Sequence, residues 1–275
     1  MVQNIKKIFN KQGFIRLKGV LDYKEDLEPV LNDMAFIMDR LVHRFVPKKD
    51  KVKVLKYNFK KMIIPKFDKS ADDRCTKNKW VKVKKKPNIV IFLADDLGYA
   101  DLGFRGSDIH TPNLDRLASE GMVLNRLYSL PICTPTRSAL MTARDPIKLG
   151  TAYAGLQPWE HGGVSPEEHF MPESFQKAGY QTAMIGKWHI GRQYESLMPH
   201  HRGFDHFFGH LNTQVDYYTH ESAGGHDLQE NGKSLKRDAY ATDIHGDESV
   251  RFLKELRDPA KPFLLYVPFL APHSP

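Results

Sequence analysis

The sequence has 275 residues, of which 41% are hydrophobic, and its 41 basic and 33 acidic side chains give a formal net charge of +8. It contains only two cysteines, which excludes a small fold held together by several disulfides. We find no apolar run long enough to span a membrane, and residues 1–10 lack the apolar core that a signal peptide requires. The cellular compartment therefore stays open.

The first part of the chain is strongly basic. Residues 1–86 hold 24 basic and 10 acidic side chains, whereas the remainder holds 17 and 23. The pattern predicts a strand over 13–21 and an amphipathic helix over 24–45, so that 1–45 form a small N-terminal segment of uncertain origin. Residues 46–86 are rich in lysine, and we interpret them as a solvated basic linker. Such a run can contact polyanions without specificity, but nucleic acid is not an expected partner.

The rest of the chain alternates apolar runs of strand length with segments of helical periodicity. The pattern predicts strands over 88–93, 122–128, 181–185 and 263–267. It predicts helices near 112–120, 134–143, 172–178 and 239–257. Strands that alternate with helices are typical of an α/β fold in which helices cover both faces of the sheet, an α/β/α sandwich.

Two adjacent carboxylates, Asp95 and Asp96, follow the first predicted strand. Ligands bind at the carboxyl ends of the strands in open α/β sheets, so we expect both side chains at such an edge. In isolation the pair could form a turn or a helix cap. Adjacent carboxylates repel each other unless a cation lies between them, and hard oxygen ligands favour Ca²⁺ or Mg²⁺ over zinc.

Cys133 precedes the predicted helix 134–143, and Arg137 lies one turn further along. The amino end of a helix favours anions, and a guanidinium holds sulfate or phosphate oxygens in a fixed plane. A lone cysteine is more often a small buried hydrophobic residue. Its position beside Arg137 favours an anion site instead.

The run Cys133-Thr134-Pro135-Thr136-Arg137 resembles the Cys-x-Pro-x-Arg signature of type I sulfatases. Further stretches resemble the same family in the same order: the strand ending at Asp95-Asp96, the Gly-Lys-Trp-His-Ile-Gly run at 186–191, and Pro272-His273-Ser274-Pro275. Residues 201–205 and 216–220 resemble the arylsulfatase B-like branch, which includes enzymes acting on sulfated N-acetylgalactosamine. The resemblance implies an alkaline-phosphatase-like sandwich over 87–275.

The resemblance also implies a modified nucleophile and a metal ion. In that family the cysteine is oxidised after synthesis to formylglycine, whose hydrated aldehyde attacks sulfur. Cys133 would then be a precursor, and a formylglycine-generating enzyme would be a partner. Asp95, Asp96 and the group made from Cys133 would bind Ca²⁺, with Mg²⁺ as the alternative.

The remaining roles that the resemblance implies concern the sulfate group. Arg137 and Lys187 would stabilise charge on the sulfuryl oxygens, His189 would assist the formylglycine hydroxyls, and His273 would protonate the leaving oxygen. The other histidines lack the spacing of metal ligands, and we expect most of them at the surface or in loops: His200, His201, His206, His210 and His226.

The chain stops at Pro275. Family members carry an Asp-Asn or Asp-Gln pair, a further lysine and a small C-terminal domain beyond this loop, so we expect 87–275 to be a partial catalytic domain. Three hypotheses stay open. The protein is a sulfuric ester hydrolase acting on an aryl or carbohydrate sulfate, a related phosphonate or phosphodiester hydrolase, or an inactive fragment with a binding role. Exported or lumenal locations are usual in the family.

Overall fold

The computed structural model describes residues 86–274. The strand predicted over 13–21, the helix over 24–45 and the linker up to residue 85 lie outside this part of the chain. The described residues form the predicted α/β fold, a six-stranded, mostly parallel sheet with helices on both faces. No helix within 86–274 is both long and apolar enough to cross a membrane.

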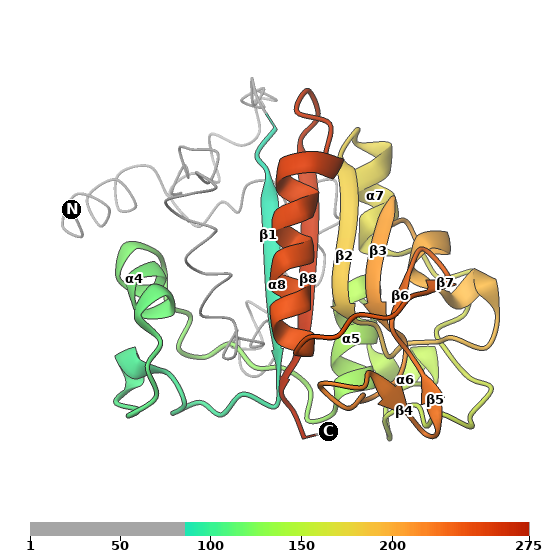
Figure 1. The fold of residues 1–275 in the computed structure, drawn as a ribbon, viewed down its shortest axis with the longest axis horizontal. Coiled ribbons are helices and arrows are strands. Elements are labelled where there is room, and N and C mark those ends of the chain that lie inside the picture. Colours follow the sequence, from blue (N-terminus) through green and yellow to red (C-terminus); the bar gives the residue numbers. More distant parts are fainter. Residues whose placement is uncertain (1–85, 275) are drawn as a thin grey trace, which may run out of the picture.

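The main sheet has the strand order β1-β8-β2-β3-β6-β7. Its strands are β1 (Ile89–Asp95), β8 (Phe263–Pro272), β2 (Gln181–Lys187), β3 (His206–His210), β6 (Gln229–Glu230) and β7 (Lys233–Ser234). The first four are parallel, and the two short strands add an antiparallel edge. A separate hairpin pairs β4 (Glu221–Ser222) with β5 (Gly225–His226). The long strand β8 lies between β1 and β2 and joins the two halves of the sheet (Figure 1).

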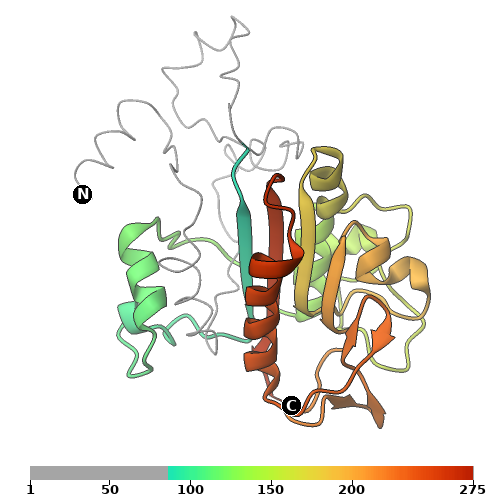
Figure 2. The same ribbon diagram turned by 45° about the horizontal axis from the view of Figure 1, so that its top comes forward.

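The helices lie along and around this sheet. The α-helices are α4 (Pro112–Glu120), α5 (Cys133–Thr142), α6 (Pro146–Leu149), α7 (Met171–Lys177) and α8 (Ala241–Arg251). A π-helical turn, Phe252–Leu256, continues α8. Single 3-10 turns cover Gly103–Arg105, Glu195–Leu197 and Pro199–His201. In both ribbon views α4 lies beyond the β1 edge, whereas α8 runs along β8 (Figures 1 and 2).

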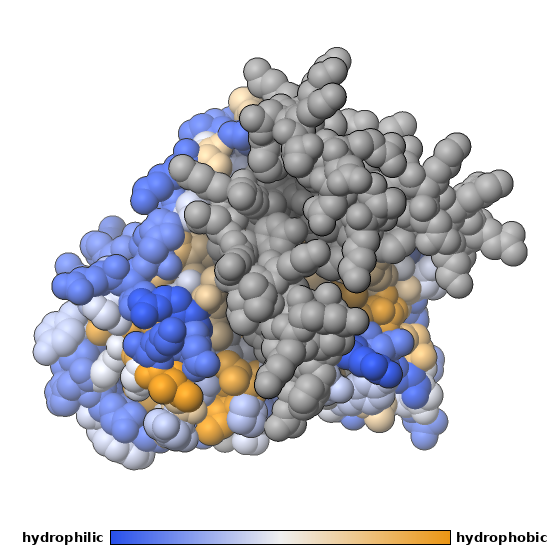
Figure 3. Space-filling view, turned by 180° about the vertical axis from the view of Figure 1, so that it is seen from behind, coloured by the Kyte–Doolittle hydropathy of each residue, from blue (hydrophilic) through white to orange (hydrophobic). Residues whose placement is uncertain are grey.

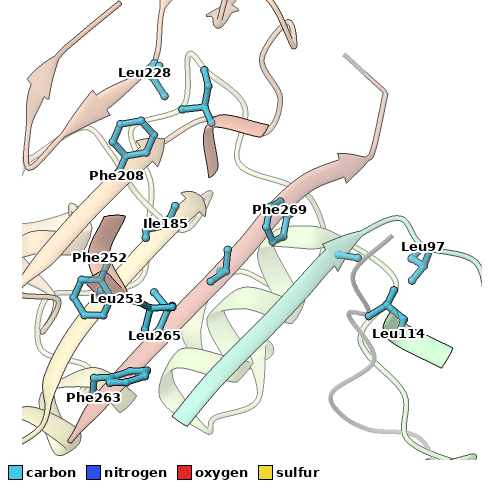
Figure 4. Close-up of a cluster of buried hydrophobic side chains, with 14 of the residues drawn as sticks. Leu97, Leu114, Ile185, Phe208, Leu228, Phe252, Leu253, Phe263, Leu265 and Phe269 are labelled. Atoms are coloured by element: carbon cyan, nitrogen blue, oxygen red, sulfur yellow. The ribbon is translucent and has the colours of Figure 1, made fainter. Parts of the chain in front are cut away.

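Two hydrophobic layers fill the space between helices and sheet, because successive strand residues point to opposite faces. On the α8 face, Leu265 and Phe269 of β8 lie in one cluster with Phe208 and Phe252 (Figure 4). On the other face, Leu264 and Tyr266 of the same strand belong to a second cluster with residues of α5 and α7, Met141 and Met171. Because β8 packs against a hydrophobic layer on each face, the side chains on both of its faces are apolar. This explains the continuous apolar run in the sequence.

One predicted element was wrong, and several short elements were missed. The strand predicted over 122–128 is irregular chain, and its apolar side chains are exposed, Met122 to 58% and Leu124 to 53%. A strand needs a neighbour to pair its backbone groups, and this segment has none among residues 86–274. Hydrophobic side chains do reach the surface of the molecule (Figure 3). Conversely, β3 was missed because only Phe207 and Phe208 of its five residues are strongly apolar, and histidines begin and end it.

Candidate active site

The residues singled out in the sequence converge at the carboxyl ends of the parallel strands. Asp95 ends β1, Lys187 ends β2, and His273 directly follows β8. Cys133 is the first residue of α5. Because these strands run in parallel, their ends meet at one edge of the sheet, and α5 points its amino end toward the same region.

A buried ion cluster lies at the centre of this edge. Asp95 Oδ2 accepts a hydrogen bond from Lys187 Nζ and another from Arg137 Nη2 at 3.1 Å. Lys187 is fully buried and Arg137 is 2% exposed. Burial alone would raise the pKa of Asp95, but the neighbouring Arg137 and Lys187 cations outweigh it and hold this pKa below its usual value. The cluster thus holds two cations against one carboxylate.

Backbone contacts fix the position of both cations. Arg137 Nη1 donates to the Lys187 carbonyl oxygen at 2.6 Å, which ties α5 to the end of β2. Gly186, the residue before Lys187, has φ +132° and lies against β8. A Cβ atom there would come within 2.1 Å of the Pro268 carbonyl oxygen, so only glycine permits this approach of the two strands. Gly186 of the sequence motif is therefore needed to place Lys187 at the end of β2.

His189 lies just beyond β2 in a left-handed backbone conformation, with φ +61°. Its ring Nε2 donates to the Leu156 carbonyl oxygen at 2.8 Å, and its Nδ1 is buried without a hydrogen-bond partner among the described residues. Burial first, and then the charge of Lys187, lower the pKa of His189 to about 3. The ring is therefore neutral at neutral pH, and Nδ1 carries the lone pair.

The His189 ring and the Cys133 thiol both lie close to Gly155. A Cβ atom on Gly155 would lie 3.1 Å from His189 Cε1 and 3.5 Å from Cys133 Sγ. Both side chains thus border the small volume that a Cβ atom on Gly155 would occupy. Lys187 also interacts electrostatically with Cys133. Cysteine, histidine and lysine are therefore neighbours here.

Asp96 and His273 lie together at the outer part of the edge. Asp96 has φ +63°, and its side chain is 70% exposed, so the left-handed turn at the end of β1 directs its carboxylate away from the core. His273 Nε2 lies 3.5 Å from Asp96 Oδ2, and the Tyr217 hydroxyl donates to the His273 carbonyl oxygen at 2.8 Å. Non-glycine residues in this conformation are uncommon and cluster at functional sites.

The donor set at this edge suits a hard divalent cation. Asp95 and Asp96 supply carboxylate oxygens from the end of one strand, and both ion pairs of Asp95 use the same oxygen, Oδ2. Carboxylates of this kind are ligands for Ca²⁺ and Mg²⁺. The chemistry of these two residues therefore fits part of an oxygen-ligand shell. Within residues 86–274, however, the ligand atoms of Asp95, Asp96 and Cys133 do not all lie within 4.8 Å of one another.

The expectation that the other histidines lie at the surface or in loops was wrong for His206 and His210, which are buried in β3. His206 Nε2 lies 3.1 Å from Glu248 Oε1 and near Glu230, a grouping of metal-binding types. Arg251 Nη2, however, lies 2.5 Å from Glu248 Oε1 and 2.6 Å from Glu230 Oε1. This guanidinium already pairs with both carboxylates, so the group is an ion-pair network.

Replacing the buried His245 by phenylalanine should flatten the pH dependence of stability. Burial lowers the pKa of His245 to about 3, whereas an unfolded histidine takes up a proton near pH 6.5. Between these values the unfolded state binds more protons, so the free energy of unfolding falls as the pH falls. Its ring packs near Phe208 and Phe269, which suits phenylalanine.

Urea unfolding at several pH values between 4 and 7 measures this slope, which should decrease in H245F by up to about 1.4 kcal/mol per pH unit. The matched control H161F changes a histidine that is exposed in the fold and should keep the wild-type slope. An unchanged slope in H245F would contradict this prediction, because it would show that His245 binds protons equally in the folded and unfolded states.

The sequence model of the Sulfatase family matches residues 87–275. The chain belongs to the sulfatase family. Among curated relatives, this sulfatase is 39% identical to mouse arylsulfatase J over 198 residues, which are 69% of this chain and 33% of the relative. It is 35% identical to mouse N-acetylgalactosamine-6-sulfatase over 210 residues, or 69% of this chain and 40% of that enzyme. The chain thus spans less than half the length of these relatives.

Solved structures agree with this assignment. Ps i-CgsB, solved in complex with k-i-k-neocarrahexaose, is 33% identical to this sulfatase and superimposes with a TM-score of 0.61 over 70% of this chain and 46% of that one. BT4656, solved with its substrate D-glucosamine-2-N,6-O-disulfate, is 33% identical, with a TM-score of 0.58 over 69% and 35% of the two chains. The α/β sulfatase fold is therefore established for the described part.

Some residues of the site were missed in the sequence. Gly155 and Leu156 lie in a loop without a motif, and only their contacts with His189 reveal them. Thr134 lies inside the Cys-x-Pro-x-Arg run, but at a position that the signature leaves variable. No sequence signal distinguishes these three residues from ordinary loop or helix positions.

Proposed function

We propose that residues 87–275 form part of the catalytic domain of a sulfuric ester hydrolase that cleaves aryl or carbohydrate sulfates, including those of glycosaminoglycans. The observation that carries this proposal is the position of Cys133, at the amino end of α5 and beside both His189 and the Arg137–Asp95–Lys187 cluster. Membership of the sulfatase family supports it. The division into 1–45, 46–86 and 87–275 is part of the same proposal.

Two groups would complete the site. Formylglycine made from Cys133 by a formylglycine-generating enzyme supplies the nucleophilic oxygen, and Ca²⁺, or Mg²⁺ in its place, supplies positive charge that makes such an oxygen more acidic. Asp95 and Asp96 are the residues of this chain that would hold the cation, together with the group made from Cys133. Their carboxylates and their position at the strand end support this assignment.

The chain's own residues would hold and protonate the substrate. Arg137 and Lys187 place two buried cations where sulfuryl oxygens gain negative charge, and such preorganised charges stabilise a transition state without reorganisation. The neutral His189 would accept a proton at Nδ1 from the nucleophilic group. His273, at the exposed side of the edge, would give a proton to the leaving oxygen.

We further propose that the substrate class is that of the arylsulfatase B-like branch. The runs 201–205 and 216–220 carry this assignment, and a relative named N-acetylgalactosamine-6-sulfatase supports a sulfated amino sugar. The structure solved for BT4656 contains a sulfated glucosamine as its substrate. A sulfated carbohydrate is therefore the substrate to test first.

The test combines two measurements on the protein purified from its native host. Mass spectrometry of the peptide containing Cys133 should show the loss of about 18 Da that accompanies conversion of the thiol to the aldehyde. Sulfate release should be detected with an aryl sulfate or a sulfated N-acetylgalactosamine and exceed turnover of matched phosphodiester and phosphonate esters. Preference for the phosphorus esters would favour the related hydrolases, whereas an unmodified thiol and heparin binding without turnover would favour a binding role.

Replacing Gly155 by alanine should reduce sulfate release by about tenfold or more. The added Cβ would lie 3.1 Å from His189 Cε1, closer than ordinary contact, and would fill the volume between this ring and Cys133. A displacement of about 1 Å at reacting groups can cost two orders of magnitude in rate. Steady-state kinetics with G225A as the matched control, where the new Cβ would meet only Ser222 O at 3.9 Å, would check this. Equal rates for both variants would contradict the proposed volume.

A further inference from the structure

We propose that Thr134 is the positioning residue that orients His189 for its part in the reaction, an inference that rests on the proposed function. Thr134 is the variable second residue of the Cys-x-Pro-x-Arg run and follows Cys133 directly. Its side chain is fully buried, although a threonine at an ordinary position of the first helical turn would be free to face solvent. Its hydroxyl donates one hydrogen bond and accepts another.

Three hydrogen bonds join Thr134, His189 and Leu156 in a closed ring. Thr134 Oγ1 donates to the His189 carbonyl oxygen at 2.9 Å and accepts from the Leu156 backbone N–H at 3.1 Å. His189 Nε2 then donates to the Leu156 carbonyl oxygen at 2.8 Å. One hydroxyl thus fixes both the backbone of the histidine and the peptide that holds its ring.

This ring of hydrogen bonds has two consequences for His189. First, it maintains the left-handed backbone of the histidine, a conformation that persists only where the surroundings enforce it. Second, the bond from Nε2 to Leu156 selects the tautomer in which Nδ1 carries the lone pair. Nδ1 is then the ring nitrogen that can accept a proton, and Cε1, the carbon between the two nitrogens, lies 3.1 Å from the Cβ position of Gly155, which is itself 3.5 Å from Cys133 Sγ.

The substitution T134V removes the hydroxyl but keeps the shape of the side chain, and T134S keeps the hydroxyl. Thr136 offers a matched control, because it is the other threonine of the same motif and its Oγ1 donates to Leu130 O, away from His189. Each variant is first analysed by mass spectrometry for conversion of Cys133, since Thr134 directly follows this residue. A further variant, T134A, serves if T134V does not fold.

The first readout does not depend on activity. Long-range ¹⁵N–¹H NMR of the His189 ring in the full chain should show one tautomer, protonated at Nε2, in the wild type, T134S and T136V. In T134V or T134A we expect a mixture of tautomers. A single Nε2-protonated tautomer in every variant would overturn the proposal.

The second readout is catalysis per converted site. In T134V or T134A we expect kcat to fall by about tenfold or more with KM changed less than threefold, and T134S should recover most of kcat. A loss in T134S as large as in T134V would overturn the role of the hydroxyl. If the wild type releases no sulfate, the proposed hydrolase activity fails, but the NMR comparison still decides whether Thr134 orients His189.

Discussion

Replacing Cys133 by alanine should abolish sulfate release, with a loss in kcat on the order of 10⁴-fold or more. Alanine cannot be converted to formylglycine, so the nucleophilic group would be missing while Arg137 and Lys187 remain in place. Because the binding contacts persist, the variant should still bind sulfated carbohydrate with an affinity close to that of the wild type. Steady-state kinetics and equilibrium binding measure the two effects separately.

The control for this experiment is the second cysteine of the sequence. C75A removes a thiol as well, but from outside the motif, and should retain wild-type turnover. The free energy of unfolding of C133A should stay within about 1–2 kcal/mol of the wild type, since only one partly buried sulfur is lost. Turnover in C133A at the wild-type rate would show that another residue is the nucleophile or that a contaminant hydrolyses the substrate.

Replacing Asp95 by asparagine should lower the free energy of unfolding by about 3–5 kcal/mol. The substitution keeps the size of the side chain but leaves the ammonium of Lys187 and the guanidinium of Arg137 buried without their counter-charge. Removing one partner of a buried ion pair strongly lowers the free energy of unfolding, because the remaining charge is shielded from water and has no opposite charge beside it. Denaturant unfolding of D95N and the wild type at neutral pH gives the difference.

Two further variants make this measurement specific. D258N breaks the exposed pair of Asp258 with Lys261, whose charged atoms lie 3.9 Å apart, and should cost no more than about 1 kcal/mol. The double variant D95N/K187M removes one of the two stranded cations, so its loss should be smaller than the sum of the single losses. Additive losses would show that Asp95 and Lys187 do not stabilise each other.

Much of the fold could be predicted because its strands are buried on both faces. The runs at 88–93, 181–185 and 263–267 are rich in apolar residues, and each lies in a strand whose side chains belong to both hydrophobic clusters. The segment 122–128 has the same composition but no partner strand in the described chain. Composition predicts what a segment is able to form, whereas pairing depends on what lies beside it.

Most residues of the site could be predicted from the sequence, but the contacts between them could not. Asp95, Arg137 and Lys187 were expected near one another through a motif resemblance, and the structure brings them into one ion cluster. The contacts of Gly155 and Leu156 depend on how a loop without a motif folds back onto His189. The sequence shows that residue 155 is a glycine, but it does not show which side chains lie beside this glycine or which carbonyl oxygen accepts a hydrogen bond from His189.

The placement of β8 between β1 and β2 determines when this protein can fold. Ile89 of β1 pairs with Leu264 of β8, far along the chain, and the ribosome makes β8 after every other strand described. Asp95 and Lys187 lie on the two sides of that strand, so their charges stay apart in the nascent chain until translation reaches Phe263–Pro272. Pairings this distant in sequence slow folding, because the connecting chain must first be closed into a loop. The candidate site is therefore assembled late, in the step that inserts the central strand.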